Sequence, residues 1–118
     1  MIVDCAVYEE GKRRPGEVSL HEALAAADTP GAFAWIGLRE PSPQEFDEVR
    51  AAFGLHELAV EDAVKAHQRP KLEVYGTDVF VVLKTARYID ARETVEFAEI
   101  LLFIGANYVV SEIGRAHV

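Results

Sequence analysis

The pattern of hydrophobic and polar positions changes near residue 70. Before that point, apolar residues recur mainly every three or four positions, which is typical of amphipathic helices. After it, apolar runs are divided by short turns that contain glycine, aspartate or asparagine, which is typical of strands joined as a meander. The chain therefore predicts a helix-rich first half and a strand-rich second half.

A strand and a helix open the predicted fold. Ile2–Tyr8 has the composition of a strand, and a polar turn follows at residues 9–16. Ser19 then precedes a helix, and Glu22 stands three residues later, in the spacing of a capping box. The expected buried stripe of this helix is Leu20, Leu24 and Ala27.

A second strand and a second helix follow. Phe33–Leu38 is apolar throughout, so we expect a strand that is covered on both faces, with Trp35 in the core. Ser42 and Glu45 form another capping-box pair around a first-turn proline, and Gly54 ends the helix that they begin. The expected core-facing residues of this helix are Phe46, Val49 and Phe53.

A third helix is expected at His56–His67, because the residue before Pro70 is pushed out of the helical region. The remaining segment predicts four strands joined by short turns. These strands are Lys71–Tyr75, Val79–Tyr88, Val95–Ile104 and Tyr108–Ser111. Together the elements predict one α/β domain in which a mixed sheet is flanked by helices.

Length and charge restrict the function. The chain has 118 residues and a formal net charge of −8, so it is long enough for one domain and lacks the basic surface that nucleic-acid binding requires. No basic-then-apolar leader opens it, and its longest apolar run, Ile100–Ile104, is far below the roughly 20 residues that cross a bilayer. We therefore expect a soluble polypeptide with no nucleic-acid partner.

The sequence offers little chemistry for an enzyme. It holds none of the phosphate-loop, dinucleotide, serine-hydrolase, zinc-protease or paired-cysteine signatures. Its single cysteine, Cys5, lies in the apolar first strand, where we expect an inert, small hydrophobic side chain. An enzyme is therefore the weaker class of function.

Glu61 and Asp62 are the pair of residues that points to a binding function. Glu61 projects toward Lys65 one turn later, which is the geometry of a surface ion pair. Asp62 falls near the apolar stripe that holds Leu55 and Ala59. Its carboxylate is therefore either a hydrogen-bonded group at the edge of the core or a group on a surface that something else covers. Periodicity alone favours the structural interpretation over a metal ligand.

Carboxylates are nevertheless the ligands that Mg²⁺ prefers, and one or two of them suffice because the ion keeps several of its waters. Adjacent side chains on a helix diverge by about 100°, so Glu61 and Asp62 cannot easily chelate one ion together. Each would need a ligand from another segment or another chain. The spacing therefore indicates a site between subunits.

Several short motifs follow one another along most of the chain. They are W-I-G-L at Trp35, F-G-L-H at Phe53, the Glu61–Asp62 pair and H-Q-R-P-K at His67. Single residues continue the set, namely Glu73, Tyr75, Phe80, Lys84, Tyr88, Glu99, Gly105, Asn107 and Ser111. In order and spacing, the set resembles the N-terminal soluble domain of the CorA family of magnesium and cobalt channels.

The resemblance implies a fold, a ligand and partners. The fold would be the α/β sandwich of the CorA soluble domain, and the parent would be a homopentamer in the inner membrane of the cell, with this domain on the cytoplasmic side. Regulatory Mg²⁺, with Co²⁺ as an alternative ion, would bind between neighbouring domains and favour the closed channel. Asp62 would be the main ligand, opposed by a carboxylate of the next subunit, and Glu61 an auxiliary one.

The resemblance is incomplete at the end of the chain. The family's stalk helix, transmembrane helices and Gly-Met-Asn signature do not occur, so we expect residues 1–111 to be a regulatory domain that does not conduct ions and that meets the membrane only through missing C-terminal helices. Residues 112–118 match the in-frame translation of a common sequencing adapter, so we expect a non-native tail. A zinc-transporting relative of ZntB type and a free-standing α/β interaction module are the alternatives.

Overall fold

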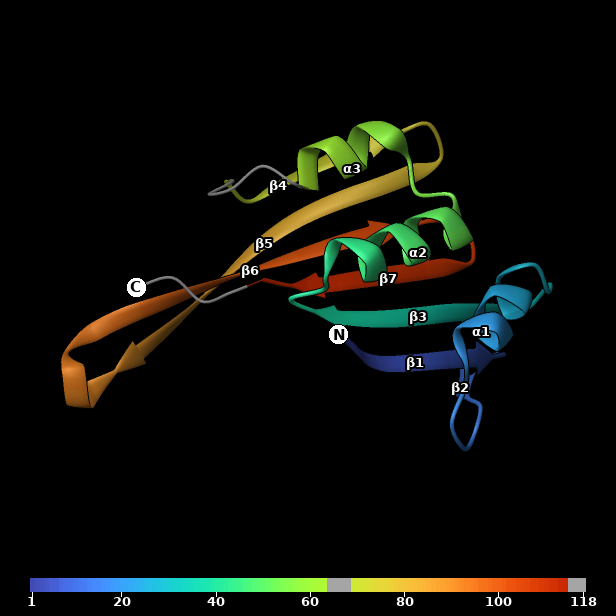
Figure 1. Ribbon diagram of the computed structural model, residues 1–118, viewed down its shortest axis with the longest axis horizontal. Helices are drawn as coiled ribbons and strands as arrows, with labels where there is room; N and C mark the ends of the chain where they lie inside the picture. The colour runs from blue at the N-terminus through green and yellow to red at the C-terminus, as the bar shows by residue number, and fades with distance from the viewer. Residues whose placement is uncertain (64–68, 115–118) are drawn as a thin grey trace.

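A seven-stranded sheet with three α-helices on one face makes up the described part of the chain (Figure 1). The computed structural model describes residues 1–63 and 69–114, apart from the side chain of Asp62. The strands are β1 Ile2–Glu9, β2 Lys12–Arg13, β3 Ala32–Arg39, β4 Lys71–Tyr75, β5 Asp78–Ile89, β6 Thr94–Ile104 and β7 Tyr108–Ile113. The helices are α1 Leu20–Ala27, α2 Pro43–Phe53 and α3 Glu57–Ala63, and a short 3-10 helix, η1, spans Asp90–Arg92.

The sheet is mixed, as the sequence predicts. Its strands follow the order β2-β1-β3-β7-β6-β5-β4. β3 and β7 run parallel, with Ile36 opposite Val110, and the other neighbouring pairs are antiparallel. The last four strands form the expected meander. Because β7 lies between β3 and β6, the two halves of the chain share one sheet.

Both predicted capping boxes are present. The backbone N–H of Glu22 donates to Ser19 Oγ over 3.1 Å at the start of α1, and the N–H of Glu45 donates to Ser42 Oγ over 3.1 Å at the start of α2. Gly54 ends α2 with a φ of 63°, a left-handed conformation that glycine adopts without strain. The local signals therefore place these helix boundaries correctly.

The core lies between the helices and the sheet face that carries Ile36 and Phe80. Val49 of α2 is fully buried in it, and Phe46 and Phe53 pack against it, as predicted. Its largest fully buried side chains are Phe80, Ile36, Leu38, Val7, Val49, Val82 and Val110.

The buried stripe of α1 differs from the prediction. Ala23 and Ala26 are its buried residues, whereas Leu20, Leu24 and Ala27 are only partly covered. The side of α1 that approaches β1 and β3 most closely carries small side chains, and the larger ones fill the margins.

The opposite face of the sheet carries no helix of the described chain, so the expectation that Phe33–Leu38 is covered on both faces is wrong (Figure 1). Trp35, expected in the core, lies on this open face and is 41% exposed. Phe33 stacks there on Tyr8, with 4.8 Å between the ring centroids. Apolar composition alone could not reveal that only one face has a helical layer.

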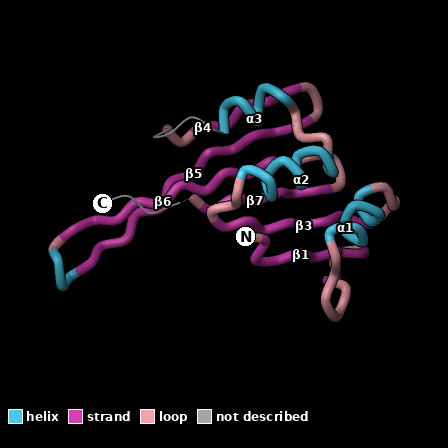
Figure 2. The backbone as a smooth tube through the Cα atoms, viewed as in Figure 1, coloured by secondary structure: helices cyan, strands magenta, loops and turns pink. Residues whose placement is uncertain are grey.

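β5 and β6 continue past the rest of the sheet as a two-stranded ribbon, which η1 closes at its tip (Figures 1 and 2). The ribbon stretches the molecule to 48 Å along its longest axis. Tyr88 and Val95 face each other on it, and both are exposed.

Two predicted boundaries reach undescribed residues. The third helix was expected at His56–His67; α3 spans Glu57–Ala63, and residues 64–67 lie outside the described part of the chain. The last strand continues past Ser111 to Ile113, so the first two residues of the predicted tail belong to β7, while residues 115–118 are not described.

Within residues 1–63 and 69–114, no helix has the length and apolar character needed to span a membrane.

Candidate metal site

Helix α3 carries both predicted ligands, Glu61 and Asp62. Its start follows directly from the end of α2, since the N–H of Leu55 donates to the carbonyl of Arg50 over 3.1 Å. His56 then begins α3: its carbonyl accepts from the N–H of Val60 over 3.0 Å. The chain thus turns from α2 into α3 within three residues.

The inner side of α3 is fixed to the core. Ala59 is buried, and Val60 and Ala63 pack against the core cluster. Leu55, just before the helix, is buried as well. These contacts set the rotation of α3 about its axis.

The structure places one of the two predicted ligands in solvent. Glu61 is exposed on α3. Asp62 belongs to the same helix, but its side chain lies outside what the structure describes, as does Lys65, the predicted partner of Glu61. Leu58, one turn before Asp62, is 53% exposed. The two carboxylates therefore belong to one short helix. Their binding of a metal ion, and the ion pair of Glu61 with Lys65, stay predictions.

An aromatic contact ties the start of α3 to the sheet. The imidazole of His56 stacks on the ring of Tyr75 at the end of β4, with centroids 5.0 Å apart and an angle of 22° between the rings. The N–H of Leu58 donates to Nδ1 of the same imidazole over 3.1 Å. His56 was not among the predicted site residues, although its place just before an apolar helix is typical of a cap.

A further carboxyl group lies beside the other end of α3. A shallow cavity of about 400 Å³ between α2 and α3 is lined in part by Val60, Ala63 and Glu112. Burial, and then the nearby carboxylate of Glu99, raise the pKa of Glu112. Because residue 112 belongs to the predicted tail, this group was not among the predicted site residues. Its alternation with buried Val110 on β7 was the signal that could have found it.

No three histidine, cysteine, aspartate or glutamate side chains gather as metal ligands in the described part of the chain.

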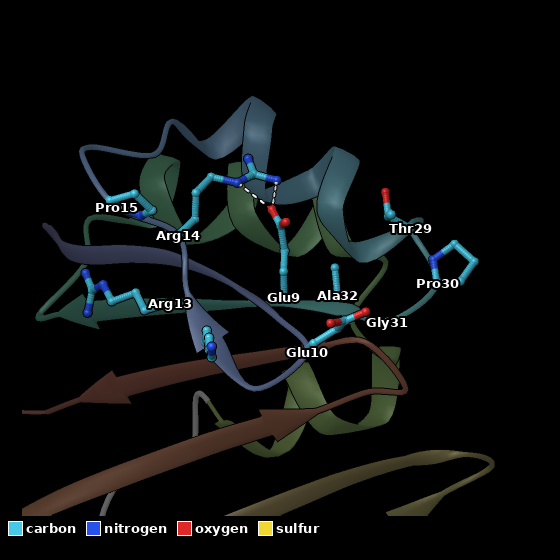
Figure 3. A pocket seen from close by; sticks show the side chains of 10 residues that line it. Glu9, Glu10, Arg13, Arg14, Pro15, Thr29, Pro30, Gly31 and Ala32 are labelled. Atoms are coloured by element: carbon cyan, nitrogen blue, oxygen red, sulfur yellow. Dashed lines mark hydrogen bonds and ion pairs between the residues drawn. The ribbon is translucent and has the colours of Figure 1, made fainter.

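A larger cavity of about 710 Å³ lies between the β1–β2 turn and the loop that enters β3. Two of its charged groups pair with each other: Arg14 points across it toward Glu9 and donates to that carboxylate over 2.7 Å (Figure 3). Arg13, nearby, pairs with Asp4 over 2.8 Å. Both arginines that line this cavity are therefore held in ion pairs.

The single cysteine is held as a thiol. Its Sγ lies 3.5 Å from the carbonyl oxygen of Ser19, to which it donates. Burial raises the pKa of Cys5, and the carboxylates of Asp4 and Glu22 raise it further. A thiol of this kind is a weak nucleophile at neutral pH, in keeping with the prediction of an inert side chain.

The comparisons with known proteins point to one family. Residues 30–112 match the family model described as CorA-like Mg²⁺ transporter protein. The cobalt/magnesium transport protein CorA of Thermotoga maritima is 38% identical over 58 residues, which are 49% of this chain and 16% of that protein. The matched range of the family model contains the whole of α2 and α3.

Solved structures share the fold. The full-length CmaX protein superposes with a TM-score of 0.68 at 20% identity, over 97% of this chain and 35% of that one. The soluble domain of CorA from Methanocaldococcus jannaschii gives a TM-score of 0.62 at 12% identity, over 100% of this chain and 43% of that one. The predicted fold, a mixed sheet with flanking helices as in the CorA soluble domain, is thereby confirmed. The chain spans less than half the length of each of these proteins.

Proposed function

Because this chain belongs to the CorA-like Mg²⁺ transporter family, we propose that it is the divalent-cation-sensing domain of a magnesium or cobalt channel. In this proposal it gates transport in a longer parent protein and does not conduct ions itself. The parent is a membrane-bound homopentamer, and the domain lies on its cytoplasmic side.

The observation that carries the proposal is the placement of α3. The helix lies inside the range that matches the family model, its inner side is fixed by Ala59 and Val60, and Glu61 is exposed on it beside Asp62. Carboxylate oxygens are suitable ligands for Mg²⁺, and a helix anchored by its apolar side can hold them at a constant position.

Two copies of the domain complete each site in this proposal. Side chains at successive helix positions diverge by about 100°, so Asp62 needs a ligand from another segment or another chain. The resemblance to the family implies that this ligand is a carboxylate of a neighbouring subunit and that Glu61 serves a second, auxiliary position. Regulatory Mg²⁺, or Co²⁺ in its place, then bridges neighbouring domains. An ion that binds between subunits stabilises the arrangement in which they are close, which is the closed channel.

Limited proteolysis of the full-length parent over a series of Mg²⁺ concentrations tests the proposal. Asp62→Asn keeps the size of the side chain and removes its charge, so the Mg²⁺ concentration for half-maximal protection should rise by about tenfold, or about 1.4 kcal/mol of lost binding free energy. Glu61→Gln should have a smaller effect. Glu57→Gln is the matched control, because Glu57 is exposed in the first turn of α3.

The same assay separates the alternatives. Stronger protection by Zn²⁺ than by Mg²⁺ would favour a zinc transporter of ZntB type. Unchanged protection of the Asp62→Asn variant with each ion would contradict the sensing proposal and favour an interaction module.

We also propose that residues 112–118 are a non-native tail behind a domain of residues 1–111. A strand is extended by backbone hydrogen bonds that depend little on side chains, so an added segment can continue β7 through Ile113. Sequencing the source DNA beyond the Ser111 codon tests this point, and native codons for residues 112–118 would contradict it.

A further inference from the structure

We propose that His56 is a positioning residue that makes the anchoring of the first turn of α3 sensitive to pH. Through α3, the candidate cation site becomes sensitive to pH as well. The inference deepens the proposed function and rests on it for the role of Glu61 and Asp62 as cation ligands. It stands by itself on the contacts of His56, which belong to the described residues.

His56 is the N-cap of α3. Its carbonyl accepts the first helical hydrogen bond, from Val60, and its Nδ1 accepts the N–H of Leu58 over 3.1 Å. The second helical position is one of those that an N-cap side chain satisfies. Since Nδ1 accepts here, it carries no proton, and the neutral ring has its proton on Nε2.

The same ring also links α3 to the sheet. Its stacking on Tyr75 connects the first turn of the helix with the end of β4, the edge strand of the sheet. One imidazole therefore satisfies a helix amide and makes a contact to the sheet. Its loss would release the first turn of α3 from both.

Protonation opposes the cap. An imidazolium donates through both nitrogens, so Nδ1 could no longer accept from Leu58. A positive charge is also unfavourable at the N-terminus of a helix. Histidine side chains as a class change charge between about pH 5 and 8, so measurements at these two pH values compare the capped with the uncapped helix.

Other titratable and charged groups stand on the elements next to His56, and none of them replaces the acceptor. Once Nδ1 is protonated, no neighbouring group can give it a lone pair again. These groups are Glu57 on α3, Glu73 and Tyr75 on the helix-facing side of β4, Asp78 opposite Tyr75 on β5, and Arg50 of α2, which pairs with Asp47.

The short distance along α3 links the cap to the candidate ligands. Glu61 is five residues after His56, which is less than two turns. Short helices gain little stability from their own hydrogen bonds and depend on caps and packing. A first turn that frays therefore loosens the backbone that carries Glu61 and Asp62.

Hydrogen exchange of the amides of residues 58–63 in the 118-residue chain tests the cap directly, with no metal present. In the wild type, protection corrected for intrinsic rates should fall by about fivefold between pH 8 and pH 5, the scale of one N-cap. His56→Asn keeps an acceptor at the capping position and does not titrate, so its protection should be equal at the two pH values.

Three further variants assign the effect. His56→Ala should have low protection at both pH values, because the acceptor is gone. Tyr75→Leu removes the stacked ring but keeps the cap, so it should lower protection and retain the fall with pH. His21→Asn, which removes an exposed histidine of α1, is the matched control and should behave as the wild type.

The outcomes separate this inference from the proposed function. A fall in protection of His56→Asn as large as that of the wild type, or no fall in the wild type, would overturn the inference, whatever Asp62 does. If the cap behaves as expected, proteolysis of the parent should need more Mg²⁺ at pH 5 than at pH 8 in the wild type and not in His56→Asn. An equal pH shift in both would overturn the link to the cation site.

Discussion

The indole Nε1 of Trp35 donates a hydrogen bond of 3.0 Å to Oγ of Ser111. The two residues are 76 positions apart in sequence and lie on β3 and β7, the parallel pair that joins the two halves of the chain. Both are on the face of the sheet that the described helices leave open. A polar side-chain contact thus supports the backbone ladder where the two halves of the chain meet.

Ser111→Ala should destabilise the domain by about 0.5–1 kcal/mol, at the lower end for a hydrogen bond because the indole is partly exposed. Urea unfolding followed by far-UV circular dichroism measures this loss in both backgrounds, since the control background removes Trp35, the only tryptophan. The control is the Trp35→Phe background, which has no donor for Ser111. There the serine substitution should cost less, and an equal cost in both backgrounds would contradict a bond between these two side chains.

Glu45 should make stability dependent on pH in the acid range. Its Oε1 accepts from the N–H of Ser42 over 3.0 Å and from the amino group of Met1 over 3.1 Å. The hydrogen bond from the Ser42 backbone, and then the amino group, lower the pKa of Glu45 below its ordinary value of 4.5. A lowered pKa means that the unfolded chain binds the proton more tightly, so this stabilisation is present above about pH 4.5 and is lost as the pH falls through the folded pKa.

Glu45→Gln removes the titrating group and checks that sign. Its urea midpoint should be lower than that of the wild type at pH 7, and the difference should shrink as the pH falls below 4.5. Glu48→Gln is the control, since Glu48 is exposed on the same helix and should show no such trend. A constant difference at all pH values would contradict the assignment.

Glu112 should have the opposite effect. Its pKa is raised, first by burial and then by Glu99, so the folded domain binds this proton more tightly than the unfolded chain. The stabilisation is complete below the unfolded pKa and is lost as the pH rises through the folded one. Glu112→Gln should therefore raise the free energy of unfolding at pH 7, by about 1.4 kcal/mol for each unit of raised pKa, and change it little at pH 4, which urea midpoints at the two pH values measure. A midpoint that falls equally at both pH values would show that the carboxylate stabilises the fold.

The edge strand β4 should promote self-association of the chain. Leu72 and Val74 lie on the open face and are 63% and 64% exposed, and β4 is the last strand in the order of the described sheet. Substituting both by lysine should reduce association in a concentration series measured by sedimentation velocity, with a stability change within about 0.5 kcal/mol. Glu73→Lys changes charge on the same strand without removing apolar surface and is the control. Association that is equally reduced in the control would indicate a general effect of charge.

Much of the local structure could be read from the sequence. Ser19 with Glu22 and Ser42 with Glu45 begin α1 and α2 as predicted, and Gly54 ends α2, because a cap involves residues only a few positions apart. The apolar runs after residue 70 became strands of a meander for the same reason: neighbouring runs with short turns pair with each other. The sequence also placed Glu61 and Asp62 on a helix, which the structure confirms.

The rest depended on contacts between distant residues. The sequence could not show that β7 inserts beside β3, that α1 presents Ala23 and Ala26 to the sheet, or that Trp35 lies on an open face, since each follows from what packs against what. For the site, the sequence supplied the carboxylates and their helix, and the tertiary structure decided that His56 caps that helix and stacks on Tyr75. The physical reason is one of range: capping and periodicity are set by near neighbours in the chain, whereas burial, strand order and the anchoring of a helix are set by surfaces that meet only in the folded protein.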